Sequence, residues 1–447
     1  MPSVYIENLG CAKNQVDAEI MGRCLEDDGW SWVDDPDGSD LIIVNTCGFI
    51  EPAQQESIDT TLSLLAAYPE TPVALSGCMA QRFADELVEG LPEVVGVFGN
   101  REPQEVVSFV RRLKDRRPGD GPLVRLPDGN GRLAAVDRGR LLSHPGSVYV
   151  KIAEGCEHNC SFCAIPSIRG RLRTRTTSDI LNEFRGLRRR GIHEFNLIAQ
   201  DLAAWHDETG GRDGTGGFPA LLRTLLQEEG DFWLRSLYLY PDTFPVEVLD
   251  IAASDGRLVP YFDLSFQHAS RNILRRMGRP GDAESYLRLV GDIRRRLPDV
   301  ALRSSFIVGF PGESEEDVDE LLDFLAQAEL EWVGVFEFSP QTGTPAAAMA
   351  AAVAPATTAE RKSRVELLQQ EIVNRRLRRF VGRSLQVLVE ERIEGVSILL
   401  GRSPLQAPDV DGLVVVHNAP AHVAPGEVVN VEVTGVTGVD LQGQYLR

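Results

Sequence analysis

The sequence predicts an α/β protein with three parts: an open, mostly parallel α/β domain, a partial or full β/α barrel, and a small C-terminal all-β barrel. Residues 1–118 and 142–378 each alternate short apolar runs with amphipathic helical patterns, which is typical of parallel sheets. Residues 119–141 are rich in Gly, Pro and charged residues, as a linker would be. Residues 379–447 change to short strands separated by glycine turns.

Four apolar runs are the expected strands of the first domain: Val4–Leu9, Leu41–Thr46, Val73–Ser76 and Val94–Phe98. The second domain has six candidates: Tyr149–Ala153, Phe195–Ile198, Leu234–Leu239, Phe262–Phe266, Leu302–Val308 and Val333–Phe338. Six strand–helix repeats favour a β/α barrel, with an open doubly wound sheet as the alternative. After a charged helix, the last module offers three further strands: Leu385–Val389, Leu413–Val416 and Val428–Val433.

Composition excludes several classes of protein. The chain has 447 residues, 43% of them hydrophobic, and a net charge of −20, so it is neither disordered nor fibrous. No apolar run approaches the roughly 18–20 residues of a membrane span. The N-terminus has no pattern of a secretion signal, so we expect a cytoplasmic protein whose cysteines are metal ligands or catalytic groups rather than disulfides. The acidic balance argues against general nucleic-acid binding and is compatible with a basic partner.

Three of the seven cysteines, Cys156, Cys160 and Cys163, lie within eight residues, directly after the first strand of the second domain. Three thiolates at this spacing can bind three irons of a [4Fe–4S] cluster and leave the fourth iron open to a ligand. A structural zinc site, the alternative, requires four closed ligands, and His158 is too tightly placed to complete one.

A second set, Cys11, Cys47 and Cys78, is widely spaced, but each cysteine follows a predicted strand. The carboxyl ends of parallel strands share one edge of a sheet, so these three can converge on a second open-iron cluster. Buried structural cysteines are instead expected inside strands or on the core faces of helices. Cys24 fits that description, and the other three do not.

The Cys-x3-Cys-x2-Cys segment, with Phe162 before its last cysteine, resembles the signature of radical S-adenosylmethionine (SAM) enzymes. The resemblance implies that SAM binds the open iron and is cleaved to a radical that removes a substrate hydrogen. Several polar residues follow barrel strands, at the rim where such sites lie, and Gln200, Gln267, Arg303, Gly309, Gly312 and Glu313 are the candidates for SAM contact. Asp201 and His268 adjoin them, and an ordinary loop is the alternative for each. The Arg169–Arg175 run is either an anion-binding or a solvated segment.

The whole chain resembles the methylthiotransferases, whose last module is a TRAM domain. The resemblance lies in the combination of two three-cysteine sets, a barrel and a C-terminal β module. Leu9–Glu19, Val44–Ile50, Ser76–Arg82 and Ala164–Arg171 are similar to the branch that modifies a ribosomal protein, the RimO-type branch. Ala12, Gln15 and Ala18 depart from that branch without removing a ligand. The resemblance implies two [4Fe–4S] clusters, two SAM molecules per product, a sulfur donor, an electron donor, and as target an aspartate β-carbon in small-subunit ribosomal protein twelve.

Two alternatives remain open: methylthiolation of transfer RNA, and a non-catalytic iron–sulfur electron carrier. From Val381 to Arg447 the C-terminal module has four arginines, no lysine and eight acidic residues. We therefore expect it to bind RNA poorly, because phosphate contacts need a basic surface, and to favour a basic ribosomal protein.

Overall fold

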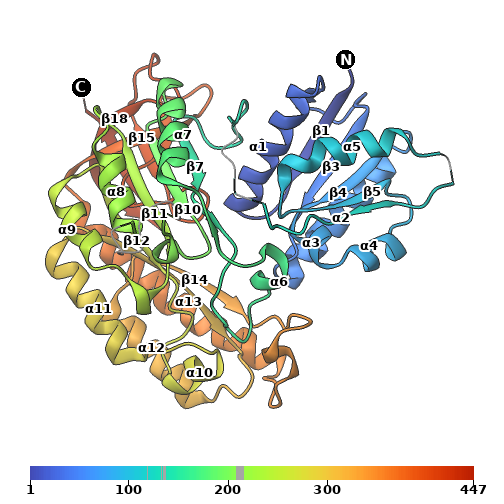
Figure 1. The fold of residues 1–447 in the computed structure, drawn as a ribbon. Helices are drawn as coiled ribbons and strands as arrows, with labels where there is room; N and C mark the ends of the chain where they lie inside the picture. The colour runs from blue at the N-terminus through green and yellow to red at the C-terminus, as the bar shows by residue number, and fades with distance from the viewer. Residues whose placement is uncertain (118, 132, 134–136, 208–215, 447) are drawn as a thin grey trace.

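The N-terminal domain is built on one six-stranded parallel sheet (Figure 1). The structure is a computed structural model, and it describes residues 1–117, 119–131, 133, 137–207 and 216–446. The strand order is β2-β1-β3-β4-β5-β6, with bounds β1 (Ser3–Asn8), β2 (Ser31–Val33), β3 (Leu41–Thr46), β4 (Val73–Ser76), β5 (Gly96–Gly99) and β6 (Leu123–Arg125). All six residues of β3 are buried, because helices cover both faces of the sheet.

Five helices connect these strands: α1 (Ala12–Asp27), α2 (Glu51–Ala67), α3 (Gly77–Arg82), α4 (Ala84–Gly90) and α5 (Val106–Lys114). The four predicted strands are confirmed, and the three-residue edge strands β2 and β6 are additions. Strand β6 lies within 119–141, so part of the segment expected to be a linker pairs with the sheet of the first domain. Arg138, in the same segment, is buried between Glu19 of α1 and Glu183 of the second domain.

The second domain is a partial barrel. Its six parallel strands have the order β14-β13-β12-β11-β10-β7, and the described strands β7 and β14 do not pair to close the sheet. The bounds are β7 (Ser147–Lys151), β10 (Glu194–Ile198), β11 (Trp233–Leu239), β12 (Leu258–Leu264), β13 (Ala301–Val308) and β14 (Trp332–Glu337). This arrangement decides between the predicted alternatives in favour of the partial barrel.

Helices pack on the outside of that sheet: α7 (Thr177–Arg189), α8 (Phe218–Leu226), α9 (Glu247–Ser254), α10 (Arg271–Arg276), α11 (Ala283–Arg296), α12 (Glu315–Ala328) and α13 (Pro355–Leu377). Short elements near the first strand complete the domain: β8 (Ala153–Glu154), α6 (Ile165–Arg169) and β9 (Arg173–Thr174). Apolar side chains of the strands and helices form one large core. Figure 1 shows α6 between the two α/β domains.

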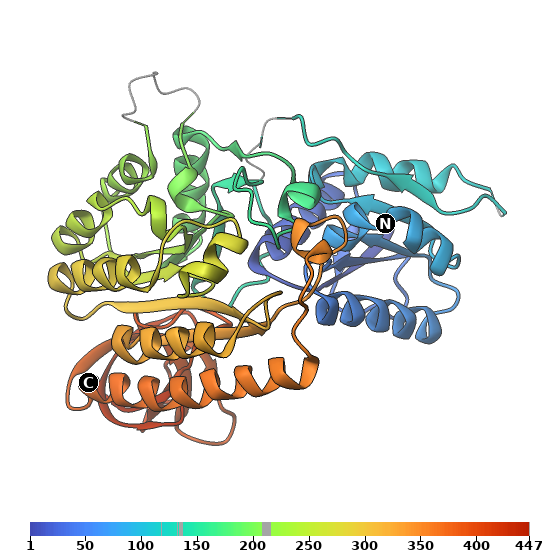
Figure 2. The ribbon, with the colours of Figure 1, turned by 90° about the horizontal axis from the view of Figure 1, so that it is seen from below.

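The C-terminal module is a closed five-stranded barrel with the order β15-β16-β17-β19-β18, as predicted. Its strands are β15 (Ser384–Arg392), β16 (Ile398–Arg402), β17 (Val414–His417), β18 (Val428–Thr437) and β19 (Asp440–Tyr445). It follows α13, with β18 against that helix, and shares an apolar cluster with the partial barrel (Figure 2). Trp332 donates from its indole nitrogen to the Leu405 carbonyl at 2.7 Å, so the module is packed onto the sheet. Within the described chain, no helix has the length and apolarity to cross a membrane.

Candidate active site

The loop with Cys156, Cys160 and Cys163 lies between β8 and α6 and is held on several sides. The Ser161 N–H donates to the Met277 carbonyl at 2.8 Å, and the Ala346 N–H donates to the Ser161 carbonyl at 2.8 Å. Gly155 has φ 82°, and a Cβ there would lie 2.0 Å from the Arg171 carbonyl oxygen, so only glycine fits this turn. The surrounding structure thus fixes the loop that presents the three thiols.

Aromatic and charged side chains surround these thiols. The His158 ring stacks on Tyr240 with ring centroids 4.0 Å apart, and its Nε2 lies 2.8 Å from Asp201 Oδ2. Arg279 is buried beside these side chains. Its guanidinium lies 3.9 Å from the Tyr240 ring centroid and 4.0 Å from Cys160 Sγ. Burial raises the pKa of the Cys163 thiol to about 12. A thiolate there consequently needs positive charge beside it, and Arg279 supplies one.

The second set of cysteines meets at the carboxyl edge of the N-terminal sheet. Cys11 is the exposed N-cap of α1, Cys47 follows β3, and Cys78 lies in α3 after β4. A Cβ added to Gly10, which has φ 88°, would lie 3.1 Å from Cys47 Sγ. The chain before Cys11 therefore passes directly beside Cys47. Burial raises the pKa of Cys78 to about 12. Arg169 acts to lower this pKa, whereas Cys11 and Cys47 act to raise it. The predicted convergence is present, whereas cluster binding stays a prediction.

The donor chemistry of both sets fits iron–sulfur clusters, since thiolates are the usual ligands of such clusters. Each thiolate of a cluster binds a different iron, so the three sulfurs need not gather around one point. In the described ranges, no three Cys, His, Asp or Glu side chains are grouped closely enough to hold a single metal ion. Cys24, on α1, packs against the core of the N-terminal domain, as a structural cysteine does.

A buried charged network connects the two sets of cysteines. Arg169 donates to Cys78 Sγ at 3.3 Å and to Asn14 Oδ1 at 2.6 Å. Its other terminal nitrogen bonds Asp17 at 2.6 Å and Glu154 at 3.1 Å. Lys151 bonds the same two carboxylates. Burial opposes ionisation of Glu154, but Arg169 and Lys151 still hold its pKa below the ordinary value. Two cations and two carboxylates thus neutralise one another at the junction of the domains.

Gln200, one of the candidates for SAM contact, joins this network. Its Nε2 donates to Glu154 Oε1 at 2.9 Å. Its Oε1 is buried and has no hydrogen-bond partner within the described chain. An unpaired buried acceptor is costly, and the N–H of a ligand would satisfy it. The position fits the predicted role, although contact with SAM stays a prediction.

The other rim candidates have partners within the protein. Gly309 and Gly312 adopt φ of 75° and 81°, and a Cβ would lie 2.3 Å from Thr358 and 2.7 Å from Arg276, respectively. Close packing therefore accounts for both glycines. Glu313 Oε1 accepts from Arg361 at 2.9 Å. Arg303 lies near the start of β13, away from the rim, and pairs with Asp263 at 3.0 Å and with Asp411 of the C-terminal module at 3.5 Å.

Gln267 and His268 follow β12. Gln267 has φ 69°, an uncommon conformation for a residue other than glycine that is often found at functional sites. His268 is fully buried, and burial lowers its pKa to about 4. For Gln267, Arg303, Gly309, Gly312 and Glu313, as for Gln200, contact with SAM remains a prediction.

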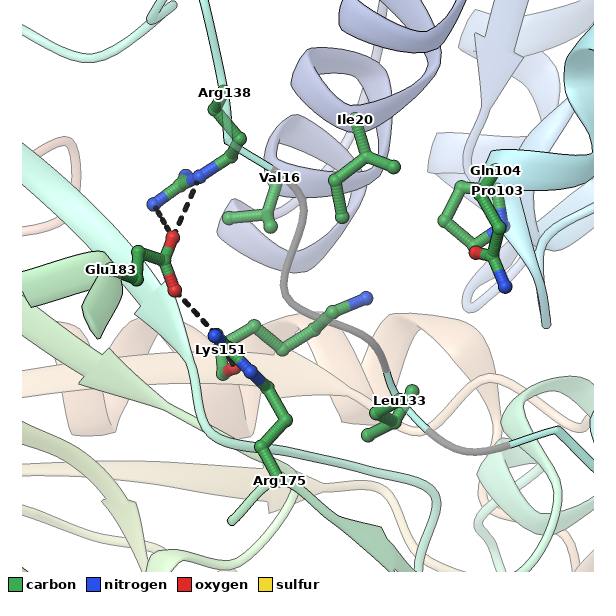
Figure 3. Close-up of a pocket in the computed structure, with 9 residues that line it drawn as sticks. All are labelled: Val16, Ile20, Pro103, Gln104, Leu133, Arg138, Lys151, Arg175 and Glu183. Atoms are coloured by element: carbon green, nitrogen blue, oxygen red, sulfur yellow. Dashed lines mark hydrogen bonds and ion pairs between the residues drawn. The ribbon is translucent and has the colours of Figure 1, made fainter. Parts of the chain in front are cut away.

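A small cavity lies beside the charged network, between α1 and the partial barrel (Figure 3). Val16 and Ile20 of α1 line one side, while Glu183 bonds both Arg138 and Arg175 on the other. Because Arg138 also pairs with Glu19 of α1, this chain of ion pairs bridges the two domains a second time.

The sequence prediction missed Asn14, Asp17, Lys151 and Glu154. A signal was present, since Lys151 and Glu154 are charged residues in an otherwise apolar strand segment. Buried charges of this kind need partners. The partners could not be named from sequence, because Asp17 and Asn14 lie more than a hundred residues away.

Three family models match the chain. Residues 3–99 match the uncharacterized protein family UPF0004, residues 150–325 the radical SAM superfamily, and residues 381–446 the TRAM domain. Ribosomal protein uS12 methylthiotransferase RimO of Treponema denticola is 39% identical over 97% of this chain and 98% of its own length. The protein of the same name from Moorella thermoacetica is 41% identical over 97% of both chains.

Solved structures support the fold. The radical SAM methyltransferase TsrM from Kitasatospora setae has a TM-score of 0.56 at 15% identity, over 75% of this chain and 73% of that one. The cobalamin-dependent radical SAM enzyme OxsB has a TM-score of 0.52 at 13% identity, over 84% of this chain and 56% of its own. At such low identity the likeness extends to the fold alone.

Proposed function

The chain belongs to the RimO family of ribosomal protein uS12 methylthiotransferases, within the radical SAM superfamily, and on that premise we propose how its two sets of cysteines divide the reaction. Membership of the superfamily implies SAM and a [4Fe–4S] cluster. We assign that cluster to Cys156, Cys160 and Cys163, and a second [4Fe–4S] cluster to Cys11, Cys47 and Cys78. One observation supports this division. The two sets of thiols come from different domains, and the buried network around Arg169, which bonds Glu154 and Cys78, connects them.

When bound, SAM and the clusters supply hydrogen-atom abstraction, a sulfur atom and a methyl group, which amino-acid side chains cannot provide. The chain itself binds, orients and shields these groups. Arg279 and Arg169 place positive charge beside Cys160 and Cys78, and at Cys78 this charge opposes the effect of burial, which disfavours the thiolate. Gln200 offers an unpaired acceptor beside Glu154. Val16 of α1 and Tyr149 of β7 belong to one buried apolar cluster, which limits the access of water to this part of the junction.

The target in this proposal is the β-carbon of an aspartate in uS12. Ribosomal proteins are basic, and several acidic residues of the C-terminal module are exposed, among them Glu391, Glu394, Glu427 and Glu432. Such a surface attracts a basic protein and repels RNA. A cytoplasmic location, where ribosomes are assembled, and an electron donor belong to the same proposal.

The test is anaerobic reconstitution of the full chain with iron and sulfide, followed by incubation with SAM, a reductant and either uS12 or transfer RNA. We expect mass spectrometry to find a methylthio group on one aspartate of uS12 and none on transfer RNA. An electron carrier would form no 5′-deoxyadenosine, and a transfer-RNA enzyme would modify the RNA. Either of those two results would refute the proposal.

A further inference from the structure

We propose that the Lys13 ammonium binds the carboxylate of the substrate aspartate beside the N-terminal cysteines. This inference rests on the proposed function, which makes an aspartate the target. Lys13 lies in the first turn of α1, two residues after Cys11, and only 8% of it is exposed. It forms no ion pair and no hydrogen bond to any residue that the structure describes. Lys151, equally buried, bonds both Asp17 and Glu154.

An aromatic ring holds Lys13 in place without neutralising it. The ammonium nitrogen lies 3.7 Å from the centroid of the Tyr238 ring. A cation over an aromatic face is attracted to it but keeps its full charge. Because burying a charge without a counterion is costly, this arrangement is best completed by an anion that arrives from outside.

The backbone of β11 is distorted at the residue that supplies this ring. Tyr238 has φ 68°, and the pairing of β11 with β12 shifts register between Ser236 and Leu239. Irregularities of this kind redirect a side chain and are frequent next to active sites. The distortion lies at the residue whose ring the Lys13 ammonium contacts.

The acidic groups near Lys13 already have partners. Burial, the largest effect, lowers the pKa of Lys13, while Cys11, Glu154 and Asp263 favour its charged form and Arg169 opposes it. Glu154 is bonded to Lys151 and Arg169, and Asp263 to Arg303 at 3.0 Å. No carboxylate among the described residues is bonded to Lys13, whereas Lys151, Arg169 and Arg303 each have one.

An aspartate carboxylate fits this position for a chemical reason. One methylene separates the carboxylate from the backbone, so fixing the carboxylate also fixes the β-hydrogens. The reaction needs these β-hydrogens held beside the cysteines to which we assign the second cluster. The site therefore selects an acidic side chain over its neutral amide.

The test measures binding of uS12 to the reconstituted full chain, with the target aspartate present or replaced by asparagine in uS12. We expect the wild-type enzyme to bind the asparagine form roughly tenfold more weakly, as for loss of a charge-assisted contact. Lys13→Met should bind both forms equally, while its iron content and its cleavage of SAM stay at the wild-type level. Lys13→Arg should keep part of the discrimination.

Lys114→Met is the matched control, because Lys114 is exposed, lies 4.3 Å from the Trp30 ring centroid and belongs to α5, which carries none of the cysteines. It should discriminate as the wild type does. Equal binding of both uS12 forms by an active wild-type enzyme would overturn the inference, as would loss of iron from Lys13→Met. A wild-type enzyme that leaves uS12 unmodified would instead refute the proposed function.

Discussion

The Arg169 guanidinium donates a hydrogen bond to Cys78 Sγ over 3.3 Å. Arg169 belongs to the partial barrel and Cys78 to the N-terminal domain, so this contact joins a residue near one set of cysteines to a member of the other. The same guanidinium bonds Asp17 and Glu154. Removing it would leave two buried carboxylates with Lys151 as their one remaining cation at this site.

Arg169→Met should therefore destabilise the metal-free protein by about 3–5 kcal/mol, the usual cost of breaking a buried ion pair. Thermal unfolding followed by circular dichroism measures this. Arg171→Met is the control, because the Arg171 side chain is 91% exposed, and it should change stability by less than about 0.5 kcal/mol. Equal unfolding temperatures for the two variants would contradict the assigned role of Arg169.

The two cysteine sets should fail in different ways when they are mutated. Cys160→Ala should abolish cleavage of SAM, since an open-iron cluster needs three thiolates and only two would remain. Cys47→Ala should still produce 5′-deoxyadenosine but form no methylthio product. Chromatography of the nucleoside and mass spectrometry of uS12 separate the two effects. Cys24→Ala, on a helix face of the N-terminal core, should keep its iron and its activity. Product from Cys47→Ala at the wild-type level would exclude the second cluster.

The acidic C-terminal module provides a charge-reversal test. Glu391 and Glu394 are exposed, whereas the Glu390 side chain is largely covered and accepts a hydrogen bond from the buried Arg402 at 2.5 Å. Replacing Glu391 and Glu394 by lysine should weaken uS12 binding several-fold at low salt and less at high salt, because salt screens exposed charges. Reversal of Glu86 and Glu89, exposed on α4, is the matched control. Unchanged binding at low salt would rule out steering by the module.

His268 should make stability depend on pH. Burial lowers its folded pKa to about 4, whereas the unfolded residue titrates near ~6.5. The unfolded chain thus binds more protons, so the contribution of His268 is complete above pH ~6.5 and is lost as the pH falls toward 4. The loss reaches about 3 kcal/mol. In the wild type, the Ser270 N–H donates to His268 Nδ1 at 2.9 Å. The His268→Asn variant keeps a hydrogen-bond acceptor at this position but has no imidazole to titrate, so it should lose less stability over this pH range. Urea unfolding of the metal-free protein, with exposed His422→Asn as control, measures the difference.

Much of the fold could be predicted from sequence, because buried parallel strands are continuous apolar runs. Leu41–Thr46 and Val73–Ser76 were predicted at the bounds that the structure has. Strands β2 and β6 are three residues long and lie at the edges of the sheet, and such short segments produce no recognisable pattern. The open form of the barrel depends on how far six strands curve, and periodicity contains no information on that.

The candidate site was predictable only where topology determines it. Cysteines after parallel strands must share one edge of the sheet, so their convergence followed from the strand pattern. Gly309 and Gly312 show the limit of this reasoning, since their partners Thr358 and Arg276 lie in helices distant in sequence. The role of Lys13 depends on a missing partner and on the backbone of Tyr238, and neither is visible in a pattern of residue types.

The open sheet of the partial barrel has one further consequence. Its edge strands β7 and β14 are far apart in the sheet order, and the N-terminal domain contacts the structure at both sides. On one side Asp17 of α1 bonds Lys151 of β7, and on the other Arg82 of α3 donates to Gln341, just after β14, at 2.6 Å. The first domain therefore serves as the wall that the barrel lacks. The two contacts place the N-terminal domain across the gap between the edge strands β7 and β14.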